Sequence, residues 1–205
     1  MSVGRGPFHF GRRVPGTAFW RGLSFRAHRP ICIGMTPTLS LRLASPADLS
    51  AVDQLLSRSY PRLLAADYPP STLVLAVPRI ARARPELLAS GSYFLAEDPE
   101  GRVLAAGGWT RGAPPRMAGI ADTGDVRHVA TDPDVARRGV GRALMTRVMQ
   151  DARGAGMQWL NCLSTRTAVP FYAALGFRPL HEAEVALAPG IVFPVLRMMA
   201  DLRTA

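Results

Sequence analysis

Lysine is absent from this chain of 205 residues, so all 25 of its basic residues are arginines. We interpret that bias as a sign of genome composition rather than of a binding site. Cysteine is scarce as well: Cys32 and Cys162 lie far apart, which argues against a disulfide framework or a zinc site. No run approaches the ~18 apolar residues of a membrane span. We therefore expect a cytoplasmic protein in a reducing setting, with no metal and no membrane partner.

Acidic residues are missing from residues 1–34, which carry six of the arginines and thus six of the +10 formal net charge. Glycines and prolines interrupt any amphipathic helix there, and the apolar core of a signal peptide is absent. We expect a disordered, arginine-rich extension over residues 1–34 and a folded domain over residues 35–205. A nucleic-acid-binding role for the extension is a rival hypothesis, but we expect no nucleic-acid partner.

From residue 39 onward the hydrophobic pattern switches between strand and helix periods. Strands are predicted at 39–43, 92–96, 103–110, 125–131, 158–163, 184–187 and 191–199. Helices are predicted from Ser45-Pro46 onward, over a proline-broken stretch at 71–88, and at 139–153 and 168–175. This order predicts an α/β fold with a single mixed, mostly antiparallel sheet of six to seven strands flanked by helices.

A glycine- and arginine-rich loop precedes the helix predicted at 139–153. The first N–H groups of a helix are unpaired and carry a partial positive charge, which suits phosphate. Gly139 and Gly141 have no side chain to keep a phosphate from the backbone, and Arg137, Arg138 and Arg142 add positive charge. These features favour a pyrophosphate site, and close helix–strand packing is the alternative explanation of the glycines. Neither a Walker loop nor a full Rossmann fingerprint is present.

A second motif follows the strand predicted at 158–163. It reads Ala168-Val169-Pro170-Phe171-Tyr172-Ala173-Ala174-Leu175-Gly176-Phe177. Together with Arg137-Arg138-Gly139-Val140-Gly141-Arg142, it resembles the GNAT superfamily of N-acetyltransferases, in which one helix and one strand separate the two motifs. The resemblance covers about residues 39–202 and is strongest over residues 126–177.

The resemblance implies a site for acetyl-CoA. The fourth and fifth strands would splay apart, and main-chain groups of Val129, Ala130 and Thr131 would bind the pantetheine arm in the gap. Backbone N–H groups from Arg137 to Arg142 would hold the pyrophosphate. Tyr172 would protonate the departing thiolate.

Two positions depart from the usual pattern of that family. Ala136 stands where Gln or Arg is common, and Arg137 is the neighbour that would compensate. Thr165 stands where Asn is common, and its hydroxyl would still offer a contact to the cofactor.

The roles of several residues have two possible interpretations each. His128 is either the base that deprotonates the amine, since the pKa of histidine lies near neutrality, or a structural histidine that pairs across the sheet. Asp122 and Asp125 either bind an ammonium group or are ordinary loop carboxylates. Cys162 is expected to be a buried apolar residue and not a nucleophile.

The remaining candidates concern the acceptor. Tyr60, Tyr68 and Trp109 either line the acceptor pocket or belong to the core. Arg111 and Arg116 either attract an anionic acceptor or are solvated loop charges.

The sequence thus predicts an N-acetyltransferase in which acetyl-CoA and a primary amine meet in one ternary complex. We expect a small-molecule or peptide amine as acceptor, and we allow for a homodimer. The alternative is an acyl-CoA-binding sensor or interaction domain without catalysis.

Overall fold

The structure is a computed structural model that describes residues 39–112 and 122–203. The extension expected at residues 1–34 lies outside the described residues. The strands are β1 Ser40–Leu43, β2 Tyr93–Glu97, β3 Val103–Arg111, β4 Thr123–Thr131, β5 Trp159–Ser164, β6 Arg178–Ala188 and β7 Ile191–Asp201. The helices are α1 Leu49–Leu64, α2 Pro70–Ile80, α3 Pro85–Leu88, α4 Val140–Gly154 and α5 Val169–Ala173. None of the described helices is both long and apolar enough to cross a membrane.

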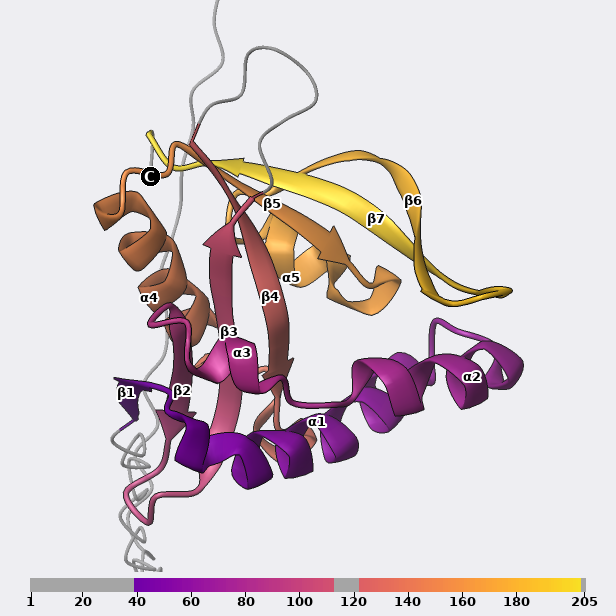
Figure 1. Ribbon diagram of the computed structural model, residues 1–205, viewed down its shortest axis with the longest axis horizontal. Helices are drawn as coiled ribbons and strands as arrows, with labels where there is room; N and C mark the ends of the chain where they lie inside the picture. Colours follow the sequence, from indigo (N-terminus) through magenta and orange to yellow (C-terminus); the bar gives the residue numbers. More distant parts are fainter. Residues whose placement is uncertain (1–38, 113–121, 204–205) are drawn as a thin grey trace, which may run out of the picture. The chain divides into compact units, whose positions relative to one another are not determined.

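The strands form one seven-stranded mixed sheet in the order β1-β2-β3-β4-β5-β7-β6. Every neighbouring pair is antiparallel except β4 and β5, which run parallel. The predicted fold class is therefore confirmed, and Figure 1 shows the sheet with its long central strands between the helices.

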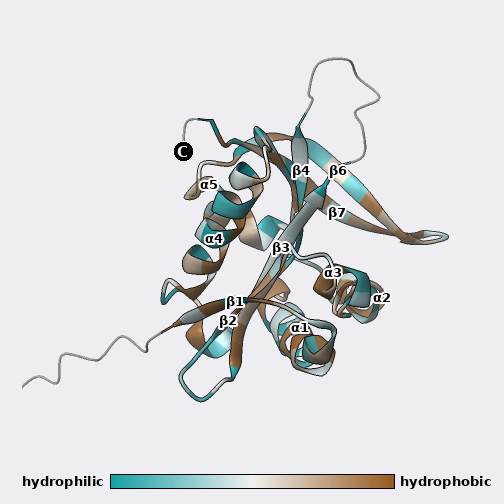
Figure 2. Cartoon of the chain, turned by 60° about the vertical axis from the view of Figure 1, so that its left-hand side comes forward, coloured by the Kyte–Doolittle hydropathy of each residue, from teal (hydrophilic) through white to brown (hydrophobic). Residues whose placement is uncertain are grey.

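The helices cover both faces of the sheet, with α4 on one side and α1 and α2 on the other (Figure 2). One core packs α4 and α5 against the sheet through residues such as Leu144, Val148 and Leu160, all fully buried. On the other face, Val52 and Leu55 of α1 pack against β2 and β3. A third cluster joins α1 and α2 to β7.

The central feature of the sheet is a split between β4 and β5. The two strands pair only at Thr123–Trp159, Gly124–Leu160 and Asp125–Asn161. Beyond Asp125 and Asn161 they continue to Thr131 and Ser164 without pairing with each other. The splayed central strands expected from the sequence are present, and the split opens toward the carboxyl ends of both strands.

A bulge interrupts β4 beside this split. The register against β3 shifts between Ala106 and Gly108, so that Gly107 faces both His128 and Val129. His128 has a φ of +44°, and a Cβ on Gly107 would lie 2.8 Å from Cγ2 of Val129. The extra residue therefore fits only because position 107 is a glycine.

Two segments differ from the sequence prediction. The helical stretch expected at 71–88 is divided into α2 and α3, because Arg84 is extended ahead of Pro85. Strand β6 begins at Arg178 rather than at residue 184. Its first residues are exposed at the sheet edge, so no hydrophobic alternation marks them.

Candidate functional site

The loop between β4 and α4 has the backbone geometry of an anion site. A 3₁₀ turn at Pro133–Val135 leads to Arg137, whose φ is +64°, and to Gly139, whose φ is +87°. Gly139 is the N-cap of α4 and offers no side-chain partner to the first N–H groups of that helix. Left-handed residues ahead of free helix N–H groups form a concave, electropositive backbone that suits phosphate oxygens.

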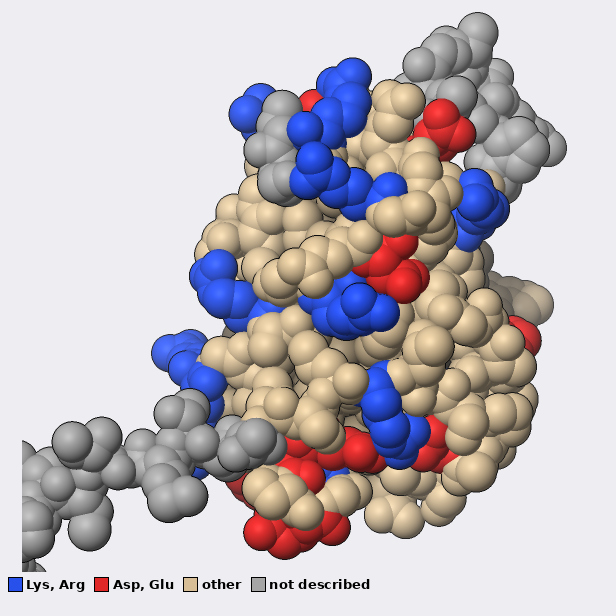
Figure 3. All heavy atoms as spheres, turned by 90° about the vertical axis from the view of Figure 1, so that its left-hand side faces the viewer, with Lys and Arg blue, Asp and Glu red and all other residues tan. Residues whose placement is uncertain are grey.

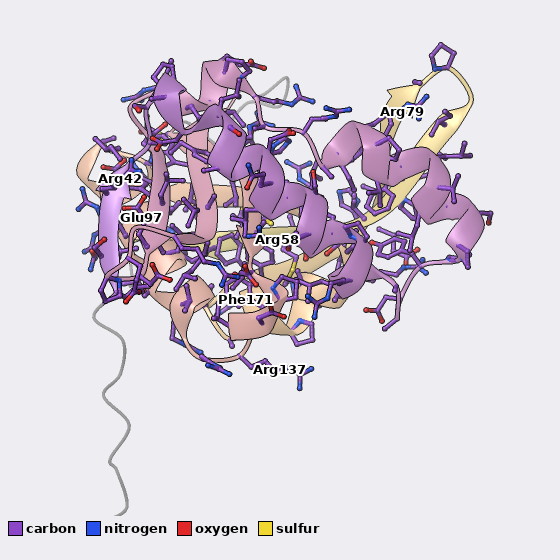
Figure 4. All side chains as sticks on the ribbon, turned by 90° about the horizontal axis from the view of Figure 1, so that it is seen from below. Arg42, Arg58, Arg79, Glu97, Arg137 and Phe171 are labelled. Carbon is purple, nitrogen blue, oxygen red and sulfur yellow. The ribbon has the colours of Figure 1, made fainter. Side chains whose placement is uncertain are left out.

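The arginines of this loop are exposed and largely unpaired. Within the described residues, Arg137 and Arg138 make no side-chain hydrogen bond or ion pair, whereas Nη1 of Arg142 donates to the carbonyl of Ala174 at 3.4 Å. Figure 4 shows Arg137 extending away from the ribbon, on the same side of the molecule as Phe171. Two guanidinium groups therefore remain available for an anion.

The two glycines of the loop have different roles. A Cβ on Gly139 would meet nothing within 4 Å, so its constraint is the left-handed backbone. A Cβ on Gly141 would lie 2.9 Å from Oγ1 of Thr131 and 3.4 Å from the Phe171 ring. The packing explanation therefore holds for Gly141, and the phosphate explanation fits only Gly139.

Asp132 anchors this loop, a role that the sequence did not reveal. Its side chain is 1% exposed, and its Oδ2 accepts hydrogen bonds from Arg58 at 3.1 Å and from Arg102 at 2.6 Å. Its Oδ1 accepts the N–H of Asp134 at 3.0 Å, which caps the 3₁₀ turn. Burial alone would raise the pKa of Asp132, but these donors hold it below its ordinary value.

The β4 edge of the split offers fewer main-chain groups than expected. The N–H of Asp132 donates to the carbonyl of Leu104 on the β3 side. Hydrogen bonding alternates along an antiparallel strand, so the N–H and C=O of Ala130 also point toward β3 and not into the split. The carbonyl of Thr131 accepts the Ser59 hydroxyl at 3.0 Å. The groups left for a ligand in the split are therefore those of Val129 and the N–H of Thr131.

Tyr172 lies on the α4 side of the split. It is 6% exposed, and its hydroxyl lies beside the thiol of Cys162 on β5. Burial raises the pKa of Tyr172 well above its ordinary value and raises the pKa of Cys162 to about 12. At neutral pH the phenol therefore retains its proton, and Cys162 is a buried neutral thiol, not a nucleophile.

His128 is a bulge residue rather than a histidine that pairs across the sheet. Its carbonyl accepts the Tyr93 hydroxyl at 2.9 Å, and its side chain has no hydrogen bond within the described residues. Burial, with Arg84 and Arg127 nearby, lowers its pKa to about 4. The imidazole is therefore neutral at physiological pH, although it is a weak base.

Thr165 lies at the turn from β5 into α5, at the open end of the split. It precedes the 3₁₀ turn Arg166–Ala168 with an extended backbone, and its carbonyl accepts the N–H of Ala168 at 3.0 Å. Its hydroxyl makes no hydrogen bond with any described residue, so it is available to a ligand.

Two of the residues predicted to line the acceptor pocket have structural roles instead. The hydroxyl of Tyr68 donates to the carbonyl of Pro194 at 2.9 Å, and the indole N–H of Trp109 donates to Asp151 at 2.9 Å. Arg111 donates to the carbonyl of Ala155, and Arg116 lies outside the described residues.

Tyr60 differs, because its hydroxyl makes no hydrogen bond within the described part of the chain. It is partly buried and packs against the two hydrophobic clusters that α1 forms on its face of the sheet.

The described residues form no metal site, and the face drawn in Figure 3 has no continuous basic surface. Residues 39–112 and 122–203 contain no group of three or more His, Cys, Asp or Glu that could hold a metal ion. Figure 3 shows one face of the molecule, on which basic side chains lie in separate groups with acidic ones between them.

The seven-stranded sheet, split between β4 and β5 and flanked by helices, has the acyl-CoA N-acyltransferase fold. Residues 89–179 match the family model of the acetyltransferase (GNAT) domain. Over this segment, which is less than half of the chain, the protein is similar to GNAT acetyltransferases. A search of curated proteins found no significant match.

Solved structures share the fold. A GCN5-related N-acetyltransferase from Rhodopseudomonas palustris is 22% identical, with 82% of this chain and 96% of that chain covered and a TM-score of 0.61. The PaiA N-acetyltransferase from Thermoplasma acidophilum, solved with coenzyme A, is 12% identical, with 80% and 99% covered and a TM-score of 0.60. The ribosomal-protein-S18-alanine N-acetyltransferase from Escherichia coli is 16% identical, with 80% and 94% covered and a TM-score of 0.53.

Proposed function

We propose that the protein is an N-acetyltransferase that transfers the acetyl group of acetyl-CoA to a primary amine by direct attack in a ternary complex. The observation that carries the proposal is the split between β4 and β5, which has the uncapped start of α4 at its open end and the protonated phenol of Tyr172 on one side. We further propose that it acts in the cytoplasm.

The residues present fit coenzyme A. The backbone from Arg137 to Arg142 is concave and electropositive, and Gly139 leaves open space where a phosphate would lie. Val129 and the N–H of Thr131 would bind the pantetheine amides, and the Thr165 hydroxyl would contact the cofactor from the turn that follows β5. When bound, acetyl-CoA supplies a thioester that an amine can attack.

The chain's own groups would then act in three ways. A backbone N–H of β4 polarises the thioester carbonyl as negative charge develops on its oxygen. The neutral amine nitrogen bonds to the carbonyl carbon, the carbon–sulfur bond breaks, and the nitrogen loses a proton to His128 or to water. Tyr172 donates its proton to the leaving sulfur and recovers it from solvent. Alignment of the two reactants supplies much of the acceleration.

The test is a turnover assay with the full chain, acetyl-CoA and a panel of primary amines. We expect free thiol and N-acetylated amine to form in equal amounts, and only when an amine is present. The acceptors of related proteins guide the panel, since the Escherichia coli neighbour is named for an alanine of ribosomal protein S18. Acetyl-CoA binding without turnover across the panel would instead favour the non-catalytic sensor.

A further inference from the structure

A row of polar side chains crosses the sheet on the face opposite Tyr172. Arg127 Nε donates to Oγ1 of Thr110 at 2.9 Å, and Arg127 Nη2 donates to Oδ2 of Asp125 at 3.3 Å. Asn161 Nδ2 donates to Oδ1 of Asp125 at 2.8 Å, and Arg197 Nε donates to Oδ1 of Asn161 at 2.8 Å. These five residues come from β3, β4, β5 and β7, and we call them the polar row.

The polar row lies where the split begins. Asp125 and Asn161 form the last β4–β5 pair before the strands separate. Leu160 and Cys162 face the α4 core, so Asn161 between them points to the other face. The polar row and Tyr172 therefore lie on opposite sides of the split.

The same face is partly covered by α1 and α2, and the polar row begins where that cover ends. Phe193 and Val195 are 3% and 5% exposed and pack against α1 and α2. Arg197 is the next residue of β7 on this face, and it remains partly exposed. A ligand between α1 and the polar row would thus reach both the split and the guanidinium group of Arg197.

The polar row has more donors than acceptors. It contains two guanidinium groups and one carboxylate, and both oxygens of that carboxylate are already engaged by Arg127 and Asn161. Each oxygen of Asp125 thus already accepts a hydrogen bond, and the carboxylate orients its neighbours. Both terminal nitrogens of Arg197 lack a partner within the described residues. A guanidinium fork of this kind binds a carboxylate or phosphate through two parallel hydrogen bonds.

We propose that the acceptor amine carries an anionic oxygen group, which Arg197 binds with the help of Arg127 while the amino group lies at the split. This inference rests on the proposed acetyl transfer and names the class of acceptor for it. A neutral amine with no anionic group would leave the terminal nitrogens of Arg197 without a partner at the site.

The test compares matched acceptors. Amino acids, their carboxamides and aminoalkyl phosphonates are assayed with acetyl-CoA and the full chain, so that the carboxylate and phosphonate arms identify the anion. We expect kcat/KM to be at least about tenfold higher for one anionic series than for the carboxamides, the effect of one charge-assisted hydrogen bond.

The matched variants are Arg197→Gln, which retains a donor to Asn161 but loses the charge, and Arg147→Gln, which removes a charge on α4 beside Asp151. Arg197→Gln should lower kcat/KM about 10- to 100-fold for the anionic acceptor and by much less for the carboxamide. It should also leave the affinity for coenzyme A and the melting temperature near those of Arg147→Gln.

Other results would overturn the inference in distinguishable ways. If carboxamides react as fast as acids, or if Arg197→Gln slows both equally, the acceptor has no anion bound at Arg197 and acetyl transfer still stands. If no anionic amine is acetylated, the inference fails. If coenzyme A also fails to bind, the proposed function fails with it.

Discussion

Replacement of Asp132 by asparagine tests how the pyrophosphate loop is held. The change keeps the shape of the side chain and the oxygen that accepts the Asp134 N–H, but it removes the negative charge that Arg58 and Arg102 share. The carboxylate is 1% exposed, whereas the two arginine side chains are 46% and 51% exposed. The arginines will therefore be rehydrated in the variant, which reduces the cost of losing their partner.

The expected magnitude follows from these exposures. Each hydrogen bond to a charged group contributes about 1.5–3 kcal/mol when it is desolvated. Because both guanidinium groups stay half in water, we expect the two bonds together to be worth about 2 kcal/mol. For a domain of this size, a loss of about 2 kcal/mol lowers the melting temperature by about 4–8 °C. The affinity for coenzyme A should fall as well, because the loop loses its anchor.

Asp134→Asn is the matched control. Asp134 lies in the same loop and pairs with Arg62 at 3.0 Å, but both side chains are about 60% exposed. Removing this pair should change stability by less than about 0.5 kcal/mol. Thermal melting and urea unfolding of both variants give the comparison. If Asp132→Asn is no more destabilised than Asp134→Asn, the buried carboxylate does not anchor the loop and our reasoning is wrong.

Three further predictions address the site. Tyr172→Phe should lower kcat on the order of 10²-fold. Its control is Tyr68→Phe, which loses two structural hydrogen bonds and should lower the melting temperature but not kcat. Equal kcat values for the two variants would refute the role of Tyr172 as the acid. Gly139→Asp should weaken the binding of coenzyme A far more than that of pantetheine, and its left-handed backbone should cost about 1–2 kcal/mol of stability. Gly141→Ala should destabilise the fold because its Cβ meets Thr131. Equal losses for both ligands in Gly139→Asp would mean that the loop only packs. The pKa of His128 is about 4 in the folded protein and about 6.5 in the unfolded chain, so acid favours the unfolded state, and stability should fall by up to about 2 kcal/mol from pH 7 to pH 5. His128→Asn, in which asparagine tolerates the positive φ, should lose that part of the pH dependence. A urea-unfolding profile with the same pH dependence in the variant would contradict the assignment.

The parts of the site that could be predicted from the sequence consist of residues that lie close together along the chain. The glycine–arginine loop, the start of α4 and the short helix that carries Tyr172 all lie within 50 residues, and local spacing reveals each of them. The split was expected only from the resemblance of the two motifs to those of the GNAT superfamily.

The parts that it missed depend on residues far apart in the chain. Asp132 is recognisable as an anchor only when Arg58 and Arg102, 74 and 30 residues away, are seen beside it. The polar row joins Asn161 to Asp125 and to Arg197, each 36 residues distant. The bulge at His128 could have been suspected from one residue only, Gly107 on the opposite strand. The alternation of apolar and polar residues alone does not show that this glycine accommodates a bulge.

The most direct test of the account is a calorimetric titration of the full chain with coenzyme A and, separately, with pantetheine. Both ligands carry the arm that we assign to the split, and only coenzyme A carries the pyrophosphate that we assign to residues 137–142. We predict that coenzyme A binds at one site per chain and at least about tenfold more tightly than pantetheine, the effect of one charge-assisted contact. Equal affinities, or no binding of coenzyme A, would contradict the account.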